Sequence, residues 1–198
     1  MDEFCNEVFL RGTLAGAPVF SHRGKTEEFF TFPLEIMRLS GTSDKINIIA
    51  GKALMDTVEI TDGDFVEISG ELRSYNNKSG KGSRLVITVF AKSIAIAQGD
   101  YENSVTLKGI LCKQPNLRKT PMGRQICDMM VAVNRKYGRS DYLPCIAWGQ
   151  TAAETAEMSV GDNIAITGRI QSRNYIKNED GVATEKTAFE LSAVSVTR

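Results

Sequence analysis

Tyrosine, tryptophan and arginine side chains alternate with aliphatic residues in the second half of this 198-residue chain. Around Ile166, apolar residues recur at every second position, as in a strand with one buried face. The set predicted to face inward is Ile164, Ile166, Gly168 and Ile170, and the set predicted to face outward is Arg169, Gln171, Arg173 and Tyr175. Flat rings on which bases can stack, together with cations for phosphates, are what binding an unpaired nucleic acid requires.

A preceding apolar segment shows the same alternation. Leu143, Cys145 and Ala147 are predicted to face the core, which leaves Tyr142 and Trp148 on the outer face. Tyr137, where the strand before it ends in a loop, is a further candidate. For each of these rings the alternative is an ordinary place in the core or in a loop.

Basic side chains around these rings are candidates for phosphate contacts, although each of them could equally be a solvated surface charge. The candidates are Arg118, Lys119, Arg124, Arg135, Lys136, Arg169, Arg173 and Lys177. In the first half a basic hairpin offers a second candidate surface, with a plain solvated hairpin as its alternative: Arg73, Tyr75, Lys78, Lys81 and Arg84.

The chain repeats itself at an offset of about 97 residues, so a duplicated domain is expected. Residues 6–14 align with residues 103–111, Arg38 with Arg135 and Asp44 with Asp141. The predicted domains are residues 1–98 and 99–198, joined by a short polar segment. At offset 98, Gly70 aligns with Gly168.

The first copy differs from the second at the candidate rings. Lys45 and Gly51 stand where Tyr142 and Trp148 stand in the second copy. The phenylalanines of residues 29–32 are expected to be mostly core, with at least one pointing outward. The second domain is therefore predicted to carry most of the binding affinity.

Each copy shows short strands separated by turn residues, with one helical segment, residues 53–59 or 151–158, between its third and fourth strands. This order predicts an all-β chain of two tandem five-stranded OB-fold barrels, each with a short helix between strands 3 and 4.

The second copy resembles the bacterial single-stranded DNA-binding protein family. The similarity lies in residues 103–109, 115–118, 132–135, 141–149, 160–162 and 168–175. The first copy resembles the family more weakly, and its basic hairpin is also similar to the primosomal replication protein N branch. The resemblance implies sequence-nonspecific binding and protection of single-stranded DNA in replication, recombination or repair. It places base-stacking aromatics at Tyr137, Tyr142, Trp148 and Tyr175.

The resemblance also implies a homodimer that forms a pseudo-tetramer of OB domains. Family members usually end in an acidic tail that recruits replication or repair enzymes, and we expect no such tail here. The alternative function is a protein-interaction module in a primosome-like or plasmid or phage replication complex. RNA is the alternative ligand, because OB-folds also bind RNA.

Composition favours a binding protein over an enzyme. His22 is the only histidine, so histidine-dependent triads and multi-histidine metal sites are excluded, and we expect no cofactor and no metal. The net charge is zero, with 11 basic and 13 acidic residues in positions 1–98 and 13 against 11 in positions 99–198. Four scattered cysteines without a CxxC pair, no signal peptide and no membrane span predict a cytoplasmic location.

Overall fold

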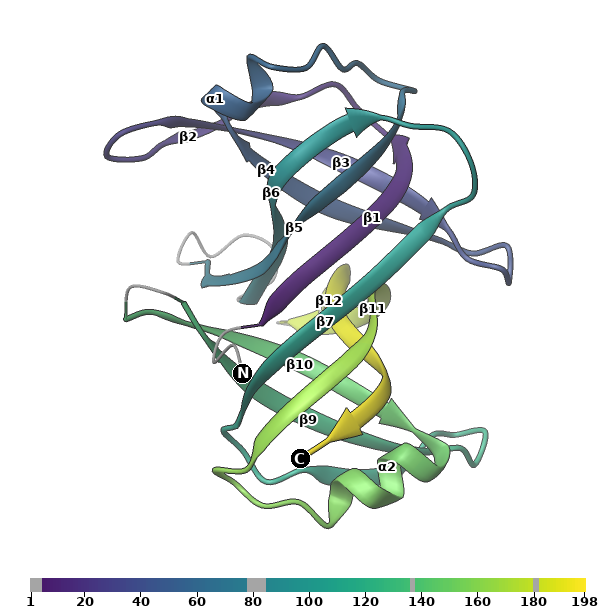
Figure 1. The fold of residues 1–198 in the computed structure, drawn as a ribbon. Helices are drawn as coiled ribbons and strands as arrows, with labels where there is room; N and C mark the ends of the chain where they lie inside the picture. The colour runs from purple at the N-terminus through teal and green to yellow at the C-terminus, as the bar shows by residue number, and fades with distance from the viewer. Residues whose placement is uncertain (1–4, 78–84, 136–137, 180–181) are drawn as a thin grey trace. The chain divides into compact units, whose positions relative to one another are not determined.

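A computed structural model describes residues 5–77, 85–135, 138–179 and 182–198 (Figure 1). By its contacts the chain divides into two compact units. One unit comprises Asn6–Arg73 and Thr88–Ser104, and the other comprises Met1–Cys5, Ser74–Ile87 and Val105–Arg198. The domain boundary near residue 98 stays a prediction. None of the helices in the described ranges is both long and apolar enough to span a membrane.

The N-terminal barrel is built from strands β1–β6 in the order β2-β3-β4-β6-β5-β1, and pairing of β3 with β1 closes it. Strands β4 and β6 run parallel. The bounds are β1 Asn6–Leu14, β2 Val19–Arg23, β3 Glu28–Met37, β4 Ser43–Gly51, α1 Lys52–Met55, β5 Phe65–Asn76 and β6 Leu85–Ile96. Because the short strand β2 pairs only at the edge of β3, five strands form the barrel.

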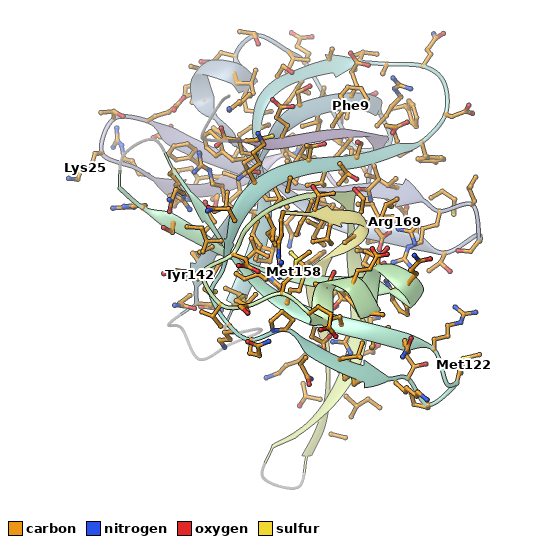
Figure 2. The ribbon with its side chains drawn as sticks, turned by 60° about the horizontal axis from the view of Figure 1, so that its bottom comes forward. Phe9, Lys25, Met122, Tyr142, Met158 and Arg169 are labelled. Carbon is orange, nitrogen blue, oxygen red and sulfur yellow. The ribbon has the colours of Figure 1, made fainter. Side chains whose placement is uncertain are left out.

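The C-terminal barrel has the same topology, in the order β7-β11-β12-β10-β9-β8 with β7 and β9 paired. Its bounds are β7 Glu102–Leu111, β8 Asn116–Lys119, β9 Gln125–Asn134, β10 Ser140–Trp148, α2 Gly149–Ala156, β11 Asn163–Glu179 and β12 Val182–Thr197. Beyond the segment that pairs with β7, strands β11 and β12 continue as a two-stranded ribbon (Figure 2). Each barrel is therefore an OB-fold, as predicted.

The two helices differ from the prediction in length. The predicted helix of residues 53–59 is only α1, which buries no side chain, whereas α2 buries Ala152 and Thr155 against the barrel. Short helices depend on such packing for their stability. Helix α2 also begins earlier than predicted, at Gly149, whose φ of +57° is accessible to glycine.

The repeated glycines mark close approaches between strands. A Cβ atom on Gly109 would lie 2.6 Å from the carbonyl oxygen of Ala132, and one on Gly12 would lie 2.5 Å from that of Glu35. Gly168 sits at a register shift in the β11–β12 pairing, where a Cβ would meet the backbone of β12. A side chain at these positions would push neighbouring strands apart.

The repeated Arg and Asp residues form one buried ion pair in each barrel. Arg38 donates Nε and Nη2 to the two carboxylate oxygens of Asp44 at 2.7 and 2.5 Å. Arg135 does the same to Asp141 at 2.6 and 2.5 Å. Both carboxylates are fully buried, so these pairs belong to the frame of each barrel.

Candidate nucleic-acid interface

Strand register brings most of the predicted second-half residues with described side chains onto one outer face of the C-terminal barrel. Residues directly opposite each other on paired strands share a face of the sheet. Arg118 and Trp148 both lie opposite Ile126, while Ser192 lies opposite both Ile146 and Arg169. We call this the platform face, formed by the outward side chains of β8, β9, β10, β12 and β11.

Two of the predicted rings have described side chains on this face, and both are accessible. Tyr142 is 51% exposed and Trp148 is 37% exposed. The alternating neighbours Leu143, Cys145 and Ala147 are buried, as predicted. Figure 2 labels Tyr142, which comes from β10, and Arg169, which comes from β11.

The orientation of Trp148 is fixed by a single hydrogen bond. Its indole Nε1 donates to the hydroxyl oxygen of Ser192 at 3.2 Å, across the parallel pairing of β10 with β12. The chain then turns into α2 at Gly149. A ring held in this way loses little side-chain entropy when a base stacks on it.

Hydrogen bonds to Ser74 hold the backbone at the start of β10, where Tyr142 lies. Its hydroxyl accepts a hydrogen bond from the Tyr142 amide at 2.8 Å, and its own amide donates to Asp141 at 2.6 Å. The next residue, Tyr75, is 51% exposed. Like Tyr142, Tyr75 therefore offers an accessible ring beside a fixed backbone.

Three of the predicted cations are held by carboxylates. Arg118 donates Nε and Nη2 to the two oxygens of Asp128, which lies on the platform face, and Arg135 is committed to buried Asp141. The hydrogen bond with Asp128 raises the pKa of the Arg118 guanidinium, and the charge of Glu190 raises it further. That effect of Glu190 agrees with β8 and β12 contributing to one face.

Arg73 is the third cation held in this way, since it forms an ion pair with Glu71. Four other predicted cations are exposed, and among the described residues they have no ion-pair partner: Lys119, Arg124, Arg169 and Arg173. These four are the side chains that can turn toward a phosphate without first breaking a salt bridge.

Gln171, which was predicted to face outward, is only 8% exposed. Its amide Nε2 donates to Oε1 of Glu190 at 2.9 Å. Glu190 lies opposite Gln171 on β12, so the two side chains shield each other from solvent. Gln171 therefore lies on the predicted side of β11, but Glu190 covers it.

The remaining predicted residues lie outside what the structure describes. Lys78, Lys81, Arg84, Lys136 and Tyr137 fall in undescribed segments, and the side chains of Tyr175 and Lys177 are also outside the description. The backbones of Tyr175 and Lys177 belong to β11, where they pair with Lys186 and Thr184.

Sequence reasoning missed Ser192, Asp128 and Glu190. Ser192 gives no signal of its own in the sequence, because its contact with Trp148 depends on the parallel pairing of two strands distant in the chain. In the described part of the chain, no three His, Cys, Asp or Glu side chains are grouped so that they could hold a metal ion.

Comparison with known proteins relates the C-terminal barrel to one family. A model of the Single-strand binding protein family matches residues 102–198. Single-stranded DNA-binding protein B of Bacillus subtilis is 39% identical over 87 residues, which cover 40% of this chain and 76% of that protein. The single-stranded DNA-binding protein of Clostridium tetani is 38% identical over 99 residues, covering 45% of this chain and 68% of that protein.

The whole chain also resembles a solved structure. The wild-type single-stranded DNA binding protein from Thermus aquaticus matches 98% of this chain and 92% of its own with a TM-score of 0.78, at 22% identity. That similarity shows the fold. The strand topology of both barrels is that of OB-fold proteins.

The chain belongs to the single-strand binding protein family, and the resemblance predicted from the second copy is confirmed.

Proposed function

We propose that this chain binds single-stranded DNA without reading its sequence and protects it in DNA replication, recombination or repair. The observation that carries the proposal is Trp148, an exposed ring that Ser192 orients. It lies on the same face as Arg169 and Arg173, which have no ion-pair partner among the described residues. Membership in the single-strand binding protein family supports the same function.

Binding on the platform face combines stacking with phosphate contacts. A base stacks on the indole of Trp148 and another on the phenol of Tyr142, each contributing about 1–3 kcal/mol. Arg169 lies opposite Ser192, and in this proposal its guanidinium neutralises the phosphate beside the first base. None of these contacts distinguishes one base from another, since every base has a π-face.

Assembly and location form part of the same proposal. The chain acts as a homodimer in the cytoplasm, so that four OB domains bind one strand together. Support comes from the duplicated fold, which supplies two barrels per chain. Light scattering should give twice the chain mass of 21.8 kDa, and a mass near 21.8 kDa would remove the dimer.

A titration with fluorescently labelled oligo-dT tests the function. Trp148 is the only tryptophan, so its own fluorescence should be quenched as the DNA binds, and less so as salt rises. Trp148→Leu should weaken binding by about 5- to 150-fold, the equivalent of one stacked base. Tyr101→Leu, in the other unit and also partly exposed, is the matched control and should bind as the wild type does.

The second candidate function is a protein-interaction module. Val19 and Phe20 favour it, since both are 58% exposed on the edge strand β2, where a partner strand could pair. If neither the anisotropy of the labelled DNA nor Trp148 fluorescence changes on mixing, this candidate replaces the first.

A further inference from the structure

Strand β10 has paired strands on both sides along only part of its length. On one side β9 pairs with it from Ser140 to Trp148. On the other side, within the described ranges, β12 pairs with it at Cys145 and Ile146 alone. Tyr142, a stacking residue in the function proposed above, precedes that pairing. Backbone groups along such an edge need another hydrogen-bond partner or stay in contact with water.

Ser74, on β5, supplies the partner at this edge. Its hydroxyl oxygen accepts a hydrogen bond from the Tyr142 amide at 2.8 Å, and both residues belong to the same compact unit. Tyr142 lies opposite Ala132 of β9. An amide hydrogen in a strand points to one side only, so Ser74 and β9 hold the backbone of Tyr142 from its two sides.

The backbone of Ser74 is itself held. Its amide donates to Oδ1 of Asp141 at 2.6 Å, and its carbonyl oxygen accepts from Nη2 of Arg135 at 3.5 Å. Asp141 is fully buried and also accepts from Nε of Arg135 at 2.6 Å. The hydroxyl that holds Tyr142 therefore extends from a backbone bound to the buried ion pair of the barrel.

Tyr142 depends on this backbone contact more than Trp148 does. The indole of Trp148 is held through its own side chain, by the hydroxyl of Ser192. The ring of Tyr142 is 51% exposed, and among the described residues it makes no hydrogen bond, ring contact or cation–π contact. Fixing its backbone before binding reduces the entropy that is lost when a base stacks on the ring.

We infer that Ser74 is a positioning residue for binding single-stranded DNA. Its hydroxyl holds the backbone of Tyr142 in the conformation in which a base stacks on the ring, and it contributes to affinity through that ring alone. The inference rests on the function proposed above for its ligand.

Ser74→Ala isolates the hydroxyl. The amide that donates to Asp141 and the carbonyl that accepts from Arg135 remain. The variant loses the bond with Tyr142 and a longer one from the hydroxyl to Asp141 at 3.4 Å. Labelled oligo-dT should bind about 5- to 30-fold more weakly, the cost of ordering one backbone residue on binding. Ser74→Thr keeps a hydroxyl on a residue that suits a strand, and should bind as the wild type does.

Ser43→Ala is the matched control. Ser43 is half-buried like Ser74, lies on β4 in the other unit, and donates its hydroxyl to Oε1 of Glu35 at 2.7 Å. The control therefore removes one comparable hydrogen bond without touching Tyr142, and its affinity for oligo-dT should equal that of the wild type. Circular dichroism and urea unfolding establish that each variant is folded under the binding conditions.

A double-mutant cycle with Tyr142→Leu separates positioning from a general loss of structure. Ser74→Ala should weaken binding in the wild-type chain and change it by less than about twofold in the Tyr142→Leu background. Amide hydrogen exchange in the free chain is the second readout. The amide of Tyr142 should exchange faster in Ser74→Ala and at the wild-type rate in Ser43→Ala.

The outcomes separate this inference from the proposed function. Failure of the wild-type chain to bind labelled oligo-dT would remove the function and the inference with it. Binding by the wild type with unchanged affinity in Ser74→Ala would overturn the inference and leave the function standing. An equal loss in the Tyr142→Leu background would do the same, because Ser74 would then act elsewhere. A loss that requires Tyr142 and is absent in Ser74→Thr supports the positioning role.

Discussion

Arg118 is held by Asp128 on the platform face, and releasing it tests whether this face binds phosphates. Asp128→Asn removes the carboxylate that accepts both guanidinium hydrogen bonds and keeps the size of the side chain. The variant frees one cation and removes one negative charge from the path of the DNA. We expect tighter binding of oligo-dT and a steeper dependence of that binding on salt.

The magnitude follows from counterion release and Coulomb's law. Each phosphate neutralised on a single strand contributes about 0.7 to the slope of log affinity against log salt. One additional contact therefore changes the ratio of variant to wild-type affinity by about 2.6-fold between about 50 and 200 mM salt. Removing a charge about 4 Å from a phosphate contributes on the order of 1 kcal/mol in water, about fivefold in affinity at low salt.

Anisotropy of labelled oligo-dT at a series of salt concentrations measures both quantities. The control is Glu67→Gln, which changes the net charge equally but lies in the N-terminal barrel, where Glu67 pairs with Arg11 at 3.6 Å. If the two variants shift affinity and slope by the same amount, only net charge matters. Arg118 would then not contact the DNA, and the placement of the phosphate path across β8 would be wrong.

Three further predictions concern the frame of the barrels. Arg135→Met leaves the buried carboxylate of Asp141 without its guanidinium, so the free energy of unfolding in urea should fall by about 3–5 kcal/mol. Gly109→Ala places a methyl group 2.6 Å from the carbonyl oxygen of Ala132 and should lower the same free energy by about 1–3 kcal/mol. Burial raises the pKa of the Cys145 thiol, so the folded chain keeps a proton that the unfolded chain loses as pH rises past 9.0. Stability should then fall by about 1.4 kcal/mol per pH unit in alkaline urea titrations, and Cys145→Ala should lessen this fall.

Much of the fold could be predicted because its signals are local and occur twice. Alternation of Val105 and Leu107 with polar residues indicates a strand, and both side chains are buried. The repeat shows that one pattern of strands is used for two barrels. Helix α1 was predicted too long because the length of a short helix depends on tertiary packing. The local sequence pattern carries no information on that packing.

The candidate site was predictable where it depends on alternation along one strand. Tyr142 and Trp148 face outward for that reason. The pairing of Arg118 with Asp128 and the support of Trp148 by Ser192 depend on which strands are neighbours and in what register. Periodicity within a strand carries no information on register between strands, so these contacts came only with the structure.

Phe90 shows the same limit more sharply. Comparing the two copies position by position finds Gly51 in place of Trp148 and predicts a lost ring. The contact between the rings of Phe29 and Phe90 joins two different strands, so this comparison cannot predict it. Contacts on one face of a barrel form between neighbouring strands, and a position-by-position comparison of the two copies does not reveal them.

The glycines at the strand crossings have a consequence for how this protein can change over generations. At Gly12 and Gly109 any side chain would collide with a backbone carbonyl, so these positions tolerate almost nothing else. The outward positions of Tyr142 and Trp148 face no such restriction, because both side chains are exposed and can change without moving the barrel. A library of random substitutions selected only for folding should therefore keep the glycines and let the aromatics drift. The duplicated chain has kept one scaffold twice while its two faces were free to diverge.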